Sequence, residues 1–218
     1  DLNILIGNEA GETLAEADHS IFFGDRAGYT ANLSEDNIFF GERSGKQVDG
    51  GVANVFMGGY NGDIDQHLNT EYGINDYSNI FSAGEDITTG TANTGFGTFA
   101  GGDISTGYFN TNAGTGSGAN TEYADFNTFI GAFAGNDDNR TNSTSNANRN
   151  TCIGFGAGSN NRDGENNLAI GYRADFSGTD ATGNTETIVI GNEATMDGNG
   201  SILIGHNGWM DDIYSIGI

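Results

Sequence analysis

The chain lacks three things that would define common classes of protein. Its single cysteine, Cys152, cannot form an internal disulfide. Only seven lysines and arginines stand against 30 acidic residues, for a net charge of −23, which excludes nucleic-acid binding through phosphate neutralisation and disfavours docking on an anionic membrane. No apolar run approaches the ~18 residues of a membrane helix, so we expect no membrane insertion by this segment.

Motifs of enzymes and metal sites are also missing. The three histidines have neither H-x-x-x-H nor H-E-x-x-H spacing, and there is no G-x-S-x-G sequence. We therefore predict no catalytic residues and no enzyme activity. Asn61, Asp63 and Asp65 alternate as at the start of an EF-hand loop, but Tyr72 stands where that loop needs an acidic residue. We assign no metal site and no cofactor, and leave calcium open.

The residues that are abundant suggest order. The 218 residues include 37 glycines, more than twice the usual share of about 7%. Low hydrophobicity with high net charge is typical of disorder, yet 14 phenylalanines and eight tyrosines stand at regular positions. Regular placement of large apolar residues favours a folded repeat protein.

A short apolar run that ends in glycine or alanine recurs thirteen times, and 17 residues is its commonest spacing. The unit reads roughly N-T-x-I-G-x-x-A-G. Seventeen residues are too few for two helices but suffice for two short strands and two turns, which is one coil of a β-solenoid. The final residues of the runs are Gly7, Gly24, Gly41, Gly58, Ala83, Gly97, Gly114, Gly131, Gly154, Gly171, Gly191, Gly205 and Gly217.

Alternation along each strand separates two faces. We predict that the residues one and three before each glycine point into the coil, and that the small residue three after it sits where a narrow coil has no room for bulk. This places Thr94, Thr111, Thr128 and Thr151 inside, which argues against an ice-binding surface.

The residue between those two should then face outward, yet it is apolar in most copies. A strand that is apolar on both sides is buried on both sides. A monomer rarely exposes such a long apolar stripe, so we predict that copies of the chain cover it. The predicted interface residues are Leu5, Phe22, Phe39, Phe56, Phe81, Phe129, Val189 and Leu203.

The repeat unit, clearest from Gly97 to Gly131 and from Gly154 to Gly171, resembles the head repeats of YadA-like trimeric autotransporter adhesins. Its 17-residue spacing is more similar to the related repeats of phage-type tail fibres, because the usual adhesin unit is shorter. The resemblance implies a left-handed parallel β-roll that forms a homotrimer, with the apolar row toward the threefold axis. It also implies a role in attachment.

We expect a single domain, residues 1–218, of about thirteen coils, with outer-loop insertions at about 59–79, 136–149 and 179–185. The chain starts inside a patterned segment, so we expect it to be a fragment of a longer fibre. The first insertion combines aromatic rings with carboxylates, a composition suited to a glycan, although its tyrosines alternatively only anchor a long loop. The candidate receptor-binding residues are Tyr60, Asp63, Asp65, His67, Tyr72 and Tyr77.

These features predict a structural and adhesive segment of an extracellular trimeric fibre, a viral or phage tail fibre on the virion. Its loops would contact a host cell-surface receptor, a glycan or a protein. One alternative is the head of a bacterial trimeric autotransporter adhesin at the cell surface. A third reading is a spike that degrades polysaccharide with paired carboxylates.

Overall fold

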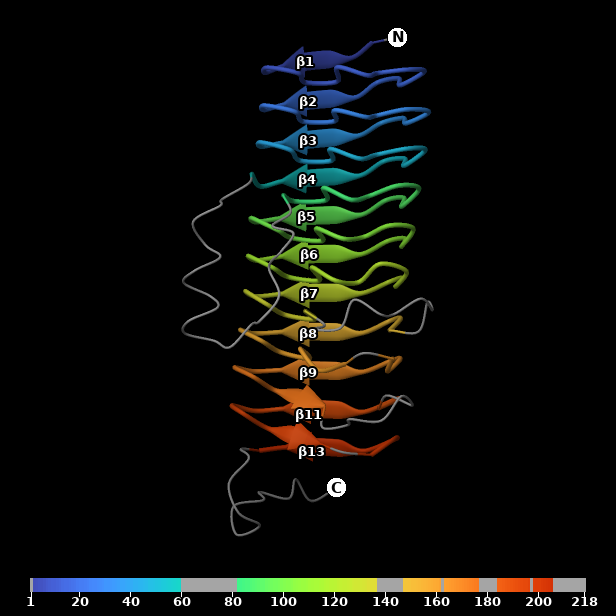
Figure 1. The fold of residues 1–218 in the computed structure, drawn as a ribbon. Helices are drawn as coiled ribbons and strands as arrows, with labels where there is room; N and C mark the ends of the chain where they lie inside the picture. The colour runs from blue at the N-terminus through green and yellow to red at the C-terminus, as the bar shows by residue number, and fades with distance from the viewer. Residues whose placement is uncertain are drawn as a thin grey trace.

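The protein is an all-β parallel solenoid whose coils stack along one axis (Figure 1). The computed structural model describes residues 2–59, 82–136, 147–161, 163–176, 184–196 and 198–205. Across these ranges every regular element is a strand, and accordingly none of them contains a helix able to cross a membrane. The predicted solenoid is confirmed.

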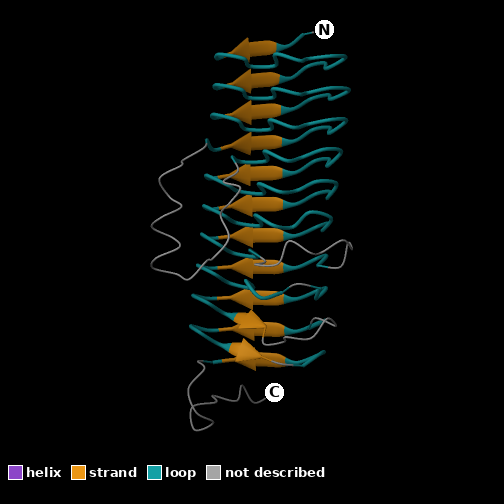
Figure 2. Cartoon of the chain, in the orientation of Figure 1, coloured by secondary structure: helices purple, strands orange, loops and turns teal. Residues whose placement is uncertain are grey.

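Each described coil contributes one three-residue strand to an eleven-stranded sheet (Figure 2). Neighbouring strands pair in parallel and in register, so equivalent residues of the repeat lie above one another. The strands, in order across the sheet, are β1 (Ile4–Ile6), β2 (Ile21–Phe23), β3 (Ile38–Phe40), β4 (Val55–Met57), β5 (Thr94–Phe96), β6 (Thr111–Ala113), β7 (Thr128–Ile130), β8 (Thr151–Ile153), β9 (Leu168–Ile170), β11 (Ile188–Ile190) and β13 (Ile202–Ile204).

A second, two-stranded sheet forms near the C-terminal end of the stack. It pairs β10 (Asp175–Phe176) with β12 (Thr195–Met196), again in parallel. Phe176 is 1% exposed and belongs to the core of the last coils, so this second wall helps to fill the interior there.

The predicted assignment of the two strand faces is wrong. The middle residue of each strand points into the coil: Phe22, Phe39 and Phe56 are fully buried within the single chain. The residues on either side of it point outward. In β2, Ile21 is half-buried and Phe23 is 45% exposed.

The narrow interior explains this reversal. A coil has room for one large side chain per strand, and the rings of Phe22 and Phe39 stack on each other with centroids 5.4 Å apart. Gly28, four residues after the repeat glycine, lies against the Phe22 ring, and a Cβ atom there would come within 2.6 Å of it. Two outward-facing residues per strand therefore flank one inward-facing residue, and not the reverse.

Most of the predicted interface residues are therefore core residues, a correction that follows from their burial. Phe22, Phe39, Phe56, Phe129 and Val189 are all at most 3% exposed in the isolated chain, so they offer no surface to another copy. Two residues at the ends of the sheet are less covered, because no further strand of the sheet lies beyond them: Leu5 is 42% exposed and Leu203 is half-buried. Phe81 lies outside the described residues.

The predicted copy that ends at Ala83 is not a strand of the sheet. β4 pairs directly with β5, with Val55 opposite Thr94. Ala83 instead occupies the small-residue position of the same coil, since the amide of Gly45 donates to its carbonyl just as the amide of Gly28 donates to that of Ser44. The sheet thus contains eleven of the thirteen predicted strands, and the copy that ends at Gly217 lies outside the described residues.

A ladder of buried asparagines runs along the coils directly before the strands. The Oδ1 atom of Asn37 accepts hydrogen bonds from the backbone amide and the side-chain amide of Asn54, at 3.0 and 3.1 Å. The side-chain nitrogen of Asn54 also donates to the carbonyl of Gly90 at 2.8 Å. The same pattern continues through Asn93 and Asn110. Each asparagine thereby satisfies buried polar groups of two coils at once, as such groups require.

Small residues pack where the sequence predicts them. The alanines three residues after the repeat glycine, such as Ala27, Ala134 and Ala157, are fully buried. The repeat glycines stack too: Gly24 has φ of +142°, and a Cβ atom there would overlap the carbonyl of Gly41 in the next coil. No other residue tolerates both that conformation and that contact.

Candidate functional site

A run of apolar residues lies on the outside of the eleven-stranded sheet. We call it the outer ladder, meaning the first and third residues of each sheet strand. Ile4, Phe23, Met57, Phe96 and Ile130 are each at least 42% exposed. The register stacks them into two columns along the described sheet. Monomeric proteins rarely expose large contiguous apolar patches.

The composition of the outer ladder changes along the stack. Its first column holds isoleucine and valine in β1 to β4, threonine in β5 to β8, and leucine and isoleucine after that. Thr111 is exposed, and Thr94, Thr128 and Thr151 are half-buried on the same face. These threonines were predicted to face inward. Their outward position removes the argument that was made from them against ice binding.

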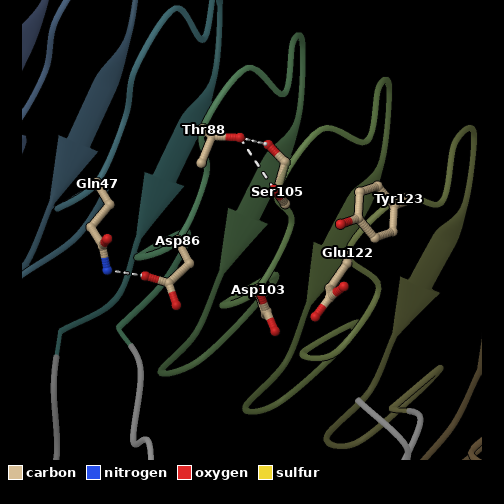
Figure 3. A pocket seen from close by; sticks show the side chains of 7 residues that line it. All are labelled: Gln47, Asp86, Thr88, Asp103, Ser105, Glu122 and Tyr123. Carbon is tan, nitrogen blue, oxygen red and sulfur yellow. Dashed lines mark hydrogen bonds between the residues drawn. The ribbon is translucent and has the colours of Figure 1, made fainter. Parts of the chain in front are cut away.

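A shallow acidic hollow of about 240 Å³ lies on the turns that follow the sheet strands (Figure 3). Three carboxylates from successive coils line it: Asp86, Asp103 and Glu122. Figure 3 shows them on one side of the chain, with Tyr123 next to Glu122. The remaining lining residues are Gln47, Thr88 and Ser105.

Hydrogen bonds fix the polar walls of the acidic hollow. The side-chain amide of Gln47 donates to the carboxylate of Asp86 in the next coil. The hydroxyl of Thr88 donates to the carbonyl of Ser105 at 2.8 Å. These bonds join equivalent positions of neighbouring coils, so the stacking of the solenoid itself holds the hollow open.

The surroundings of Asp86 in the acidic hollow raise its pKa. Burial, together with the carboxylates of Asp103 and Glu85, raises the pKa of Asp86 to about 6 against the opposing charges of Lys46 and Arg43. Asp86 therefore takes up a proton in mildly acidic solution, which reduces the repulsion between the coils.

Directly behind the acidic hollow, a buried ion pair fixes the turn of the β4 coil. Glu85 is 1% exposed, and its Oε1 atom lies 2.6 Å from the guanidinium of Arg43 and 3.6 Å from the ammonium of Lys46. Its other oxygen accepts from the amide of Ser82 at 2.7 Å. A buried carboxylate needs such partners, and through Glu85 this contact ties Ser82 to Arg43 and Lys46.

None of the predicted receptor-binding residues, Tyr60, Asp63, Asp65, His67, Tyr72 and Tyr77, lies among the described residues. The acidic hollow was not identified from the sequence. The 17-residue spacing of Asp86 and Asp103 was the available signal, because equal spacing in a solenoid means equal position on neighbouring coils.

The acidic hollow does not have the ligand set of a metal site. Among the residues that the structure describes, no three His, Cys, Asp or Glu side chains are grouped closely enough to hold a metal ion. The carboxylates are instead interleaved with amide and hydroxyl groups, a mixture that suits hydrogen bonding to a polar ligand.

Comparisons with protein-family models, curated proteins and solved structures found no match for this chain. Functional inference therefore depends on its own residues and geometry.

Proposed function

We propose that the chain is a structural and adhesive segment of an extracellular homotrimeric fibre, with the outer ladder turned toward the threefold axis. The coils would wind as a left-handed roll, and the fibre would be a viral or phage tail fibre that attaches the virion to a host cell. The resemblance of the repeat unit supports this assignment. The observation that carries it is the exposed outer ladder over eleven strands, apolar except for the threonines of β5 to β8 and stacked in two columns.

The outer ladder supports self-association for energetic reasons. Burial of apolar surface stabilises by roughly 25 cal/mol per Å², and the exposed isoleucine and phenylalanine side chains gain little while they face water. Three chains around one axis bury all three ladders in one core and leave the charged turns in solvent. The reversal of the faces thus moves the proposed interface from the middle residues to their neighbours.

Light scattering after size-exclusion chromatography tests this proposal. We expect a mass of three times 22.7 kDa at micromolar concentration. Replacement of Phe23 and Met57 by serine should yield a folded monomer, since both side chains are exposed in the single chain. A well-folded wild-type monomer at that concentration would refute the proposal.

We further propose that the acidic hollow contributes to receptor contact, with a glycan as the ligand. Carboxylates, amides and hydroxyls accept and donate to sugar hydroxyls, and Tyr123 offers a ring face. Binding of host cells or a glycan array should weaken in the Asp103→Asn variant and persist in Glu12→Gln, an exposed acidic position distant in the chain.

Two alternative functions predict different experimental results. A bacterial adhesin head would bind to host cells or matrix as part of a cell-anchored protein. A polysaccharide-degrading spike would release reducing ends from a capsule polysaccharide, and the Asp86→Asn and Asp103→Asn variants would abolish that release. Absence of turnover would leave only the attachment role.

Ice binding is a second candidate, favoured by the outward threonines of β5 to β8 on a regular sheet. It competes with the trimer for the same surface. A monomer that lowers the freezing point of water, and loses this activity in Thr111→Val, would support it. Bulky neighbours such as Phe96 make the surface uneven and favour the trimer.

A further inference from the structure

Both edges of the outer ladder change in charge along the stack. We call the residue two positions before each sheet strand the leading edge and the residue two positions after it the trailing edge. At β2 and β3 the trailing edge is acidic, with Asp25 and Glu42, and the leading edge is polar, with His19 and Asp36. At β5, β6 and β7 neither edge carries a charge.

The leading edge is aromatic at β6 and β7. Phe109 and Phe126 are 56% and 53% exposed. Their rings stack with centroids 5.4 Å apart and an interplanar angle of 11°. Both residues have positive φ, +56° and +60°, a conformation that bulky side chains rarely adopt. The same position has positive φ in other coils, for example at His19 and Asp36, so the backbone there belongs to the repeat turn. What is particular to Phe109 and Phe126 is a pair of large stacked rings exposed to water.

The trailing edge at the same levels offers a matching surface. It consists of Thr115 and Ala132, both half-buried, which directly follow the strands that end with Ala113 and Ile130. These side chains are short and uncharged, so rings can lie flat across them. At β3, by contrast, the acidic trailing edge, Glu42, would face the acidic leading edge, Asp36, of a second copy and repel it.

Symmetry determines which coils of two copies meet. In a closed ring of three chains each contact is heterologous, so the leading edge of one copy faces the trailing edge of the next. A closed rotation has no translation along its axis, so each coil faces the same coil of its neighbour. Phe109 and Phe126 then lie level with Thr115 and Ala132 of the next copy.

From this we infer, on the basis of the proposed trimer, that the Phe109–Phe126 stack of each copy packs on the Thr115–Ala132 edge of its neighbour. The occupant of the aromatic edge is a second copy of this chain. Contact between the edges is confined to the coils of β5, β6 and β7, while the acidic turns elsewhere remain hydrated. Three such contacts close the ring and fix its axial register.

Cysteine cross-linking tests the contact directly. In the Phe126→Cys, Ala132→Cys double variant, one thiol lies on each side of β7 in the same coil, and within a subunit their backbones are at most roughly 20 Å apart. A short bis-maleimide should therefore link different copies and give covalent dimers and trimers on denaturing gels. The matched control pairs Phe126→Cys with Thr98→Cys, which lies two coils away, about 10 Å along the axis. Each single variant measures the background from the buried Cys152.

A second experiment measures the contribution of the rings. Phe109→Ser with Phe126→Ser should raise the concentration at which trimers dissociate about tenfold or more, as removal of interface aromatics does. Leu33→Ser removes a side chain that is 59% exposed, three residues from the leading-edge position of another coil, and should change it little.

The outcomes separate the two proposals. Trimers that cross-link through 126 and 132, and not through 126 and 98, support the edge contact. Trimers that fail to cross-link through 126 and 132, or that cross-link better through 126 and 98, overturn it while the trimer stands. Monomers by light scattering overturn both.

Discussion

The first and last coils fill their interior with side chains from different strands. In the first coils the ring comes from the strand itself, and Phe22, Phe39 and Phe56 form one buried cluster. In the last coils the strands supply Cys152, Ala169 and Val189, with Leu203 partly buried against them, and Phe176 of β10 completes the cluster from the second sheet. A Cβ atom added at Gly158 would overlap Cys152 and come within 3.5 Å of the Phe176 ring.

The middle coils use a third arrangement. The centre of β5 is Gly95, and the ring of Phe56 from the coil above occupies the space that a side chain there would take. Ile87 and Ile104, on the turns, are fully buried and complete the same cluster. The interior of each coil is therefore filled, as close packing requires, but the sequence position of the side chain that fills it varies from coil to coil.

The largest expected effect comes from truncation of the residue that fills each region. Phe39→Ala and Phe176→Ala should each lower the free energy of unfolding by about 3–5 kcal/mol. Cys152→Ala, at the middle position of β8, should cost only about 1 kcal/mol because little volume is removed. Urea denaturation measures all three.

The neighbouring outer-ladder residue provides the control for this comparison. Phe40→Ala removes a ring that is half-buried outside the coil, so we expect less than about 1–2 kcal/mol in a monomer. If Phe40→Ala were as destabilising as Phe39→Ala in a monomeric state, the assignment of the faces would be in error.

The second effect concerns the glycine that lies against the ring in the first coils. Gly28→Ala places a methyl group 2.6 Å from Phe22 at a φ of +58°, and should cost about 2–4 kcal/mol. Gly200→Ala has the same φ region but no atom within 4 Å, so only the backbone cost of about 1 kcal/mol remains. Equal melting temperatures for the two variants would exclude the ring contact as the cause.

The two regions also bury carboxyl groups differently, which predicts a pH dependence. Glu85 has Arg43 and Lys46 as partners, whereas Asp175 accepts hydrogen bonds only from neutral groups, the side chains of Ser159 and Asn160 among them. Burial raises the pKa of Asp175 to about 6 from its usual 3.8, although these hydrogen bonds oppose the shift.

Because the folded-state pKa is higher than the unfolded one, the contribution of Asp175 is most stabilising below pH 4 and is lost as the pH rises through 6. Asp175→Asn should remove this loss, so that wild type falls by up to about 3 kcal/mol more than the variant between pH 4 and 7. Chemical denaturation at a series of pH values measures the two slopes. Parallel slopes would show that Asp175 titrates normally.

A smaller gain is expected in the middle coils. Asn112 is fully buried at the centre of β6, and neither polar atom of its side chain has a hydrogen-bond partner among the described residues. Asn112→Leu keeps the branched shape of the side chain and removes the unsatisfied groups, so it should stabilise by about 1–2 kcal/mol. A loss of stability would mean that the amide is satisfied in solution.

The smallest effect is the response to salt. A trimer carries three times −23 charges, and ions screen repulsion beyond a Debye length of about 10 Å at 0.1 M. The melting temperature should therefore rise by a few degrees between ~10 mM and ~500 mM sodium chloride. Replacement of Glu42 by glutamine on the acidic edge should reduce the rise slightly, and an unchanged melting temperature would show that repulsion is negligible.

Much of the fold was predictable because the repeat is regular. The 17-residue spacing gave the parallel solenoid, and the buried alanines such as Ala27 and Ala134 lie where small residues were expected. The asparagine of the N-T-x-I-G unit was visible, but its place in a buried ladder depends on hydrogen bonds between coils that no single copy contains.

The wrong predictions arose where a local sequence pattern is compatible with two structures. Alternation shows that Phe22 and Phe23 lie on opposite faces but does not say which face is inside, and only the width of the coil decides this. The run that ends at Ala83 matched the unit by composition although its small residues continue the β4 turn. The acidic hollow required three coils in register, which a search for motifs along the chain does not reveal.

Because the coils are similar, a strand could pair with the wrong neighbour, and the unequal spacings between strands oppose this. A stack of identical 17-residue units would pair equally well after a slip by one whole unit, and the folding chain would have many frame-shifted traps. Here the distance from β4 to β5 is 39 residues, whereas that from β11 to β13 is 14. These unequal spacings, together with the packing of the Phe56 ring over Gly95, favour one register in which each strand pairs with its correct neighbour.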